Sequence, residues 1–148
     1  MQKAKPDTMK IARDTFSKIA EKFPHLIITE NKNDPVEISL TIPKQPGLKF
    51  KVWLCLQNND ELHFSVGHFW LAWFPCTDSQ IVEHYIEAVI GFLSGNYRVL
   101  EHYRGRWCIN AVLQKPQDNR WESIGSWATG WGIFLKWLPE TFKEVRNF

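Results

Sequence analysis

The chain has 148 residues, of which 44% are hydrophobic and 23% are charged, so its composition is that of a globular protein and excludes a disordered chain or a coiled coil. Its 18 Lys and Arg against 16 Asp and Glu give a net charge of only +2, which disfavours a protein dedicated to binding DNA. The apolar stretches are too short to span a bilayer and residues 1–6 lack the apolar segment of a secretory signal, so we expect a single soluble domain over residues 1–148, located in the cytoplasm.

An amphipathic helix is predicted near the start of the chain. Apolar residues recur at three- and four-residue spacing over residues 9–23, and charged residues lie between them. Asp7 or Thr8 can accept hydrogen bonds from the first backbone N–H groups of this helix, and Pro24 ends it. The short β-branched segment that follows, residues 25–30, predicts a first strand.

Three more strands are predicted to complete a four-strand antiparallel meander. Apolar and polar residues alternate over residues 36–42, 48–56 and 62–74, as expected for strands with one buried face. If residues 58–60 form the loop between the last two strands, the register is fixed and the two apolar faces coincide. That register predicts the following cross-strand pairs: Leu56 and Leu62, Leu54 and Phe64, Val52 and Val66, Cys55 and His63, and Trp53 and Ser65.

The second half of the chain predicts a helix, a hairpin, one more strand and a closing helix, over residues 80–93, 97–113, 121–127 and 138–145. Thr77 and Gln80 have the spacing of a capping box at the start of the first of these helices. The hairpin loop around Arg104 and Gly105 has two or three residues, and its length decides which face each side chain occupies. The resulting order, α-β-β-β-β-α-β-β-(β)-α, predicts an α+β fold with one antiparallel sheet of about six to seven strands and helices packed on one face.

Tryptophan is unusually frequent, with 8 residues in the chain. Four lie close together near the C-terminus: Trp121, Trp127, Trp131 and Trp137. Large flat side chains of this kind suit a partner-binding patch or the wall of an apolar pocket, although they could equally fill a core built from short strands. Our leading hypothesis is a small non-enzymatic binding protein that uses this aromatic third of the chain to bind a protein partner or a second copy of itself.

A first alternative is a small-molecule-binding protein or an enzyme with a pocket between the sheet and the helices. Trp70, Trp107 and Trp121 would line this pocket. His68 would be its polar group, because it interrupts the apolar row of the fourth strand. A buried histidine that bonds to a neighbouring carbonyl or carboxylate explains the same position without a ligand.

A second, less favoured alternative is binding of single-stranded nucleic acid by the hairpin. Arg104 and Arg106 stand among aromatic residues, a combination that can pair with phosphates and stack on bases. Because the net charge is small, a solvated edge hairpin with internal ion pairs is the simpler interpretation. Nucleic acid and membranes are therefore not expected partners.

Few residues could support catalysis or bind a metal ion. Cys55, Cys76 and Cys108 are an odd number without CxxC spacing, which disfavours disulfides and a structural zinc site. Cys55 and His63 could provide a nucleophile and its base, but no third group orients the histidine, and Cys108 with Glu101 is a weaker pair. We predict no catalytic residue, metal or cofactor, and we do not favour an enzyme.

Overall fold

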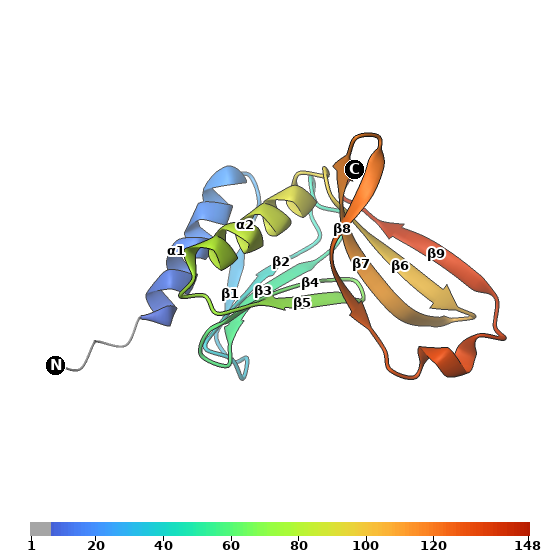
Figure 1. Cartoon of the computed structure of the whole chain (residues 1–148). Coiled ribbons are helices and arrows are strands. Elements are labelled where there is room, and N and C mark those ends of the chain that lie inside the picture. Colours follow the sequence, from blue (N-terminus) through green and yellow to red (C-terminus); the bar gives the residue numbers. More distant parts are fainter. Residues whose placement is uncertain (1–6) are drawn as a thin grey trace.

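The computed structural model describes residues 7–148, which form two α-helices and nine strands in two antiparallel sheets (Figure 1). The predicted α+β class is confirmed. The prediction of one sheet is wrong, because the meander and the second hairpin belong to separate sheets. No helix among these residues is long and apolar enough to cross a membrane. The expectation about residues 1–6 lies outside the described part of the chain.

Both helices begin at an aspartate. The carboxylate of Asp7 accepts a backbone hydrogen bond at the start of α1 (Thr8–Lys22), and the carboxylate of Asp78 does the same for α2 (Ser79–Leu93). The predicted capping box placed Thr77 at this position, but the cap lies one residue later, where a carboxylate is available. The two helices lie side by side on one face of the first sheet (Figure 1).

The first sheet has five strands in chain order: β1 (Thr29–Asn31), β2 (Ile38–Ile42), β3 (Val52–Gln57), β4 (Glu61–Val66) and β5 (Phe69–Trp73). All five predicted pairs between β3 and β4 are confirmed. The first strand is shorter than predicted, because the chain turns over residues 24–26 before it enters β1.

The segment 62–74 is two strands instead of the single strand that its apolar alternation predicts. Val66 pairs with Phe69, so Gly67 and His68 form a two-residue turn between β4 and β5. Gly67 has a φ of +57°, a conformation that glycine adopts without a Cβ penalty and that suits tight hairpins. The turn moves His68 out of the apolar row and to the end of the sheet, where its side chain is 56% exposed.

The second sheet has four strands in the order β8, β7, β6, β9, with bounds β6 (Arg98–Arg104), β7 (Trp107–Gln117), β8 (Arg120–Ala128) and β9 (Glu140–Val145). Arg104 pairs with Trp107, so the hairpin loop has two residues, Gly105 and Arg106. The strand predicted over residues 121–127 is confirmed as β8.

The predicted closing helix over residues 138–145 is wrong, because residues 140–145 form β9 and every residue of β9 pairs with β6. An isolated helix of this length is marginal in water, whereas pairing satisfies the free edge of β6. The pairing also buries Val145 and places Glu144 within 2.8 Å of the Arg98 guanidinium on the other face.

The two sheets share one cluster of buried side chains. Phe64, Tyr85 and Phe92 fill the space between α2 and the first sheet, and Leu113 joins the same cluster from the inner face of the second sheet. The sheets approach closely at Gly125, where an added Cβ would lie 2.4 Å from Leu71. The opposite, outer face of the second sheet is not covered by either helix (Figure 1).

Candidate functional site

Five exposed apolar side chains lie at the start of β7 and in the segment that connects β8 to β9. Their exposed fractions run from 43% to 80%. We call this group the aromatic surface, and it consists of Trp107, Trp131, Ile133, Phe134 and Trp137. In Figure 1 the connecting segment, drawn in orange-red with its short helix, lies at the end of the second sheet farthest from α1.

The connecting segment is held in a defined conformation. Its 3-10 helix, η1, spans Gly132–Leu135, and the indole N–H of Trp137 donates to the Phe134 carbonyl oxygen at 3.1 Å. The ring of Trp131 meets the ring of Trp107 edge to face, with centroids 5.7 Å apart. The backbone N–H of Gly105 donates to the Pro139 carbonyl oxygen at 2.8 Å and ties the segment to the β6–β7 turn.

Positive charge borders the aromatic surface. The guanidinium carbon of Arg106 lies 4.8 Å from the centre of the Trp107 ring. Arg104 is neutralised by Glu140, with an N–O distance of 3.2 Å. Within residues 7–148, neither Arg106 nor Lys136 takes part in an ion pair. The surface therefore combines apolar rings with two cations that remain available to a partner.

The structure brings together only some of the predicted binding residues. Trp107 and Trp131 belong to the aromatic surface, and Arg106 borders it. Trp121 lies at the other end of β7 and β8, where the guanidinium carbon of Arg98 stands 4.2 Å above its ring. Trp127 packs against the core from the inner face.

The residues predicted to line a ligand pocket are separated. Trp70 lies on the outer face of the first sheet, with its ring 5.1 Å from that of His63. Trp107 and Trp121 are at opposite ends of the second sheet, and His68 is in the β4–β5 turn. The predicted interior position of His68 is wrong, although it does bond to a carboxylate, that of Glu101.

Ile133 and Phe134 were missed by the sequence reasoning. A signal was present, because residues 131–138 are almost all apolar yet follow neither a helical nor a strand period and stand next to glycines. The missing period therefore indicates an irregular segment, but it does not show which of its side chains are exposed.

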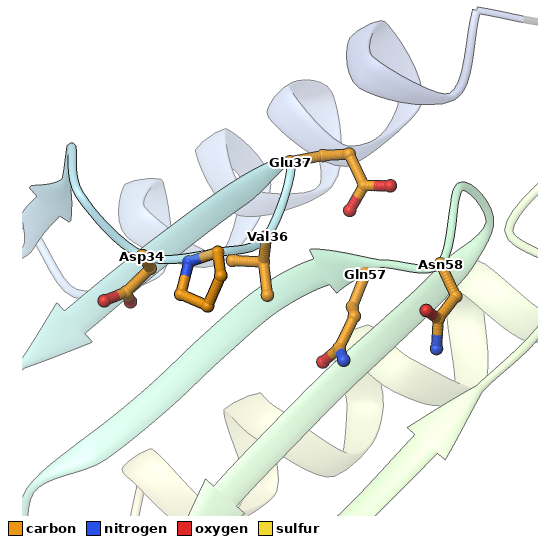
Figure 2. A pocket seen from close by; sticks show the side chains of 6 residues that line it. Asp34, Val36, Glu37, Gln57 and Asn58 are labelled. Atoms are coloured by element: carbon orange, nitrogen blue, oxygen red, sulfur yellow. The ribbon is translucent and has the colours of Figure 1, made fainter.

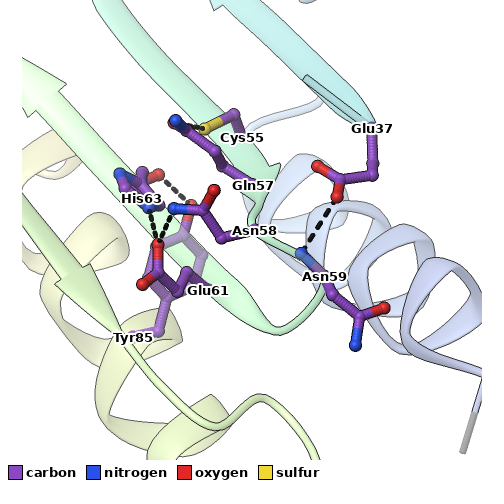
Figure 3. Close-up of polar contacts among 8 residues, drawn as sticks. All are labelled: Glu37, Cys55, Gln57, Asn58, Asn59, Glu61, His63 and Tyr85. Carbon is purple, nitrogen blue, oxygen red and sulfur yellow. Dashed lines mark hydrogen bonds and ion pairs between the residues drawn. The ribbon is translucent and has the colours of Figure 1, made fainter. Parts of the chain in front are cut away.

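The Cys55 and His63 pair lies on the outer face of the first sheet (Figure 3). Burial raises the pKa of the Cys55 thiol to about 12, and the nearby carboxylates of Glu37, Asp34 and Glu61 add to the effect. The thiol is therefore protonated at neutral pH and is a poor nucleophile. The Nε2 atom of His63 lies 3.0 Å from the Glu61 carboxylate, whose pKa is lowered by hydrogen bonds from Asn58 and His63.

A shallow depression next to this pair is lined by residues 34–37 and by Gln57 and Asn58 (Figure 2). Its carboxylates already have partners in the protein. Glu37 accepts from the backbone N–H of Asn59 at 2.9 Å, as Figure 3 shows, and Asp34 accepts from the Ser39 hydroxyl. This arrangement leaves the aromatic surface as the stronger candidate for a binding site.

No protein-family model, curated protein or solved structure matches the chain.

Proposed function

We propose that the protein binds a partner protein through the aromatic surface and has no enzymatic role there. The observation that carries this proposal is the exposure of Phe134 and Trp137, at 75% and 80%, on a segment whose conformation is fixed by hydrogen bonds. Apolar groups of this size gain free energy when they leave water, at roughly 25 cal/mol per Å² of buried surface. Contiguous exposed apolar patches on a folded protein mark interaction sites.

The kind of side chain also supports a protein partner. Tryptophan is enriched among residues that dominate the binding free energy of protein interfaces. Because the Trp137 indole is already oriented by the Phe134 carbonyl, little conformational entropy is lost when a partner covers it. We expect Trp137 to enter an apolar pocket of the partner, with Phe134 and Trp131 around it.

The charges favour a different protein over a second copy of this chain. A symmetric dimer built on the aromatic surface would bring Arg106 and Lys136 of both copies into one interface, where like charges repel. A partner with Asp or Glu around its apolar pocket would instead pair with both cations. Our proposal also places the protein in the cytoplasm. Its three unpaired cysteines support this location, because thiols stay reduced in the cytoplasm and tend to form disulfides outside it.

Photo-crosslinking in cells that produce the protein tests the proposal. A benzophenone amino acid replaces Trp137 in one variant and Trp70 in the control, since Trp70 is a 45% exposed tryptophan outside the aromatic surface. We expect one defined protein adduct from position 137 and none from position 70. Adducts to lipid, or the same mixture of adducts from both positions, would contradict the proposal. An adduct between two copies of the chain would also contradict the proposal, because it would show that the aromatic surface mediates self-association instead of binding a different protein.

A further inference from the structure

Four polar side chains meet where the β4–β5 turn reaches the second sheet. His68 comes from the turn, Glu101 and Tyr103 from the inner face of β6, and Cys108 from β7. A bulge in the pairing of β6 with β7 sets Cys108 opposite Tyr103, so that its side chain also faces inward. Residues far apart in the sequence thus form one cluster at the junction of the two sheets.

The distances within this cluster are short. The Nδ1 atom of His68 lies 2.9 Å from Oε2 of Glu101, and the hydroxyl of Tyr103 donates to Oε1 of Glu101 at 2.9 Å. The ligand atoms of His68, Glu101 and Cys108 all lie within 4.8 Å of one another. The Tyr103 oxygen is a further 3.4 Å contact of the His68 Nδ1 atom.

Hydrogen bonds hold the buried carboxylate of Glu101, but no Lys or Arg of the described residues pairs with it. Glu101 is only 2% exposed; its Oε2 accepts from the backbone N–H of His68 at 2.7 Å beside the His68 ring, and its Oε1 accepts from the Tyr103 hydroxyl. Lys143 is its register partner on β9 but forms no ion pair with it in the described part of the chain. The only ion-pair partner of Glu101 there is His68, whose side chain is open to solvent. A cation can therefore reach the carboxylate from the side of His68.

We propose that His68, Glu101 and Cys108 bind one divalent transition metal ion of the zinc type. Imidazole nitrogen, carboxylate oxygen and thiolate sulfur are the ligands that zinc uses in proteins, at about 2.0 to 2.3 Å, and three protein ligands leave one position for water or for Tyr103. Ligand atoms in such a site are roughly 3.5 Å apart. The 2.9 Å between His68 Nδ1 and Glu101 Oε2 must therefore widen, and any separation near 4.8 Å must shorten. Metal binding thus requires small side-chain rotations, for which the exposed His68 has room.

Metal binding requires one proton to leave. Burial and the neighbouring Glu101 raise the pKa of the Cys108 thiol, so the thiol is protonated in the free protein. On binding, the S–H bond breaks, the proton passes to solvent and the sulfur lone pair binds the metal ion. The thiol and imidazole ligands favour Zn²⁺ or Co²⁺ over Mg²⁺ or Ca²⁺, which prefer oxygen ligands.

Titration of the purified full-length protein with Co²⁺, in a reductant that lacks thiols, tests the site. We expect saturation at one equivalent with a sulfur-to-cobalt charge-transfer band and visible bands of tetrahedral cobalt, both removed when Zn²⁺ is added. The Cys108→Ser variant should lose the charge-transfer band, and His68→Ala should weaken binding by at least about tenfold. Cys76→Ser and His84→Ala, which change the same residue types elsewhere, should bind as the wild type does.

Absence of the charge-transfer band in the wild type, or its persistence in Cys108→Ser, would overturn the proposal. The His68→Ala change lies on an exposed turn, so it tests the site even if Cys108→Ser does not fold. A thermal stabilisation by Ca²⁺ equal to that by Zn²⁺ would also overturn it, because it would indicate a site that uses oxygen ligands alone.

Discussion

Asn147 provides a direct test of how the C-terminus is held to the rest of the fold. Its side chain is 1% exposed and bonds to three backbone groups: it accepts from Lys49 N at 2.8 Å and donates to the carbonyl oxygens of Gly47 at 2.8 Å and Leu93 at 2.7 Å. Replacing Asn147 by Ala removes all three bonds and leaves the carbonyl oxygen of buried Leu93 without this donor. At about 1 to 1.5 kcal/mol per bond, the free energy of unfolding should fall by about 3 to 5 kcal/mol.

Urea unfolding followed by tryptophan fluorescence measures this loss, which corresponds to a fall of roughly 10 °C in Tm for a chain of this size. Asn96→Ala is the matched control, because Asn96 is exposed, and it should change the free energy of unfolding by no more than about 0.5 kcal/mol. The Asn147→Asp variant should lose at least as much as Asn147→Ala, because it sets a carboxylate against two carbonyl oxygens. If Asn147→Ala lost no more than Asn96→Ala, the reasoning would be refuted.

Three further predictions concern packing, ionisation and the aromatic surface. Gly91→Ala should lower the free energy of unfolding by about 1 to 3 kcal/mol, because the new Cβ would lie 2.4 Å from the Tyr97 ring. Urea unfolding of the double variant should show that Tyr97→Ala, which removes that ring, relieves much of this loss. The free energy of unfolding should fall as pH rises from 9 toward 12, because the pKa of the Cys55 thiol is about 12 in the folded protein and 9.0 in the unfolded chain. The Cys55→Ala variant should reduce this slope by up to about 1.4 kcal/mol per pH unit, as measured by urea unfolding at several pH values. Phe134→Ser and Trp137→Ser should each change the free energy of unfolding by less than about 0.5 kcal/mol, since both side chains are exposed; a larger loss would mean that they support the fold.

The first sheet could be predicted in detail because local patterns and tertiary structure agree there. Apolar and polar residues alternate over β3 and β4, and a polar loop joins the two strands. Only one pairing register then buries the apolar faces of both strands, and the structure has that register. Asn58 and Asn59 both have positive φ, which asparagine tolerates better than most residues, so the loop chemistry was also readable.

The errors came from interactions between distant segments. Glu140–Val145 has no strong local preference, and it forms a strand because β6 offers an edge about forty residues earlier in the chain. The division into two sheets likewise depends on how β5 meets the second sheet, which alternation does not encode. The turn at Gly67 was hidden because residues 69–74 are all apolar, so the even-numbered alternation of β4 can be continued through them. In the structure the odd-numbered residues Phe69, Leu71 and Trp73 share the face of Val66, Phe64 and Leu62 instead.

The candidate site could be predicted only in part. The aromatic content pointed to the C-terminal third, and Trp107, Trp131 and Arg106 do lie together. Which tryptophans are exposed depends on strand faces: Trp127 points inward, whereas Trp107 points outward. The cluster of Glu101 with His68 depends on the junction of the sheets, and no spacing in the sequence reveals it.

The affinity of the partner captured at position 137 tests the central claim most directly. Isothermal titration calorimetry compares the wild type with Trp137→Ser and with Trp70→Ser, the change of an exposed tryptophan outside the aromatic surface. We expect Kd to rise at least about thirtyfold for Trp137→Ser, a loss of about 2 kcal/mol, and to stay unchanged for Trp70→Ser. Equal affinities of the wild type and Trp137→Ser would contradict the assignment of the aromatic surface as the binding site.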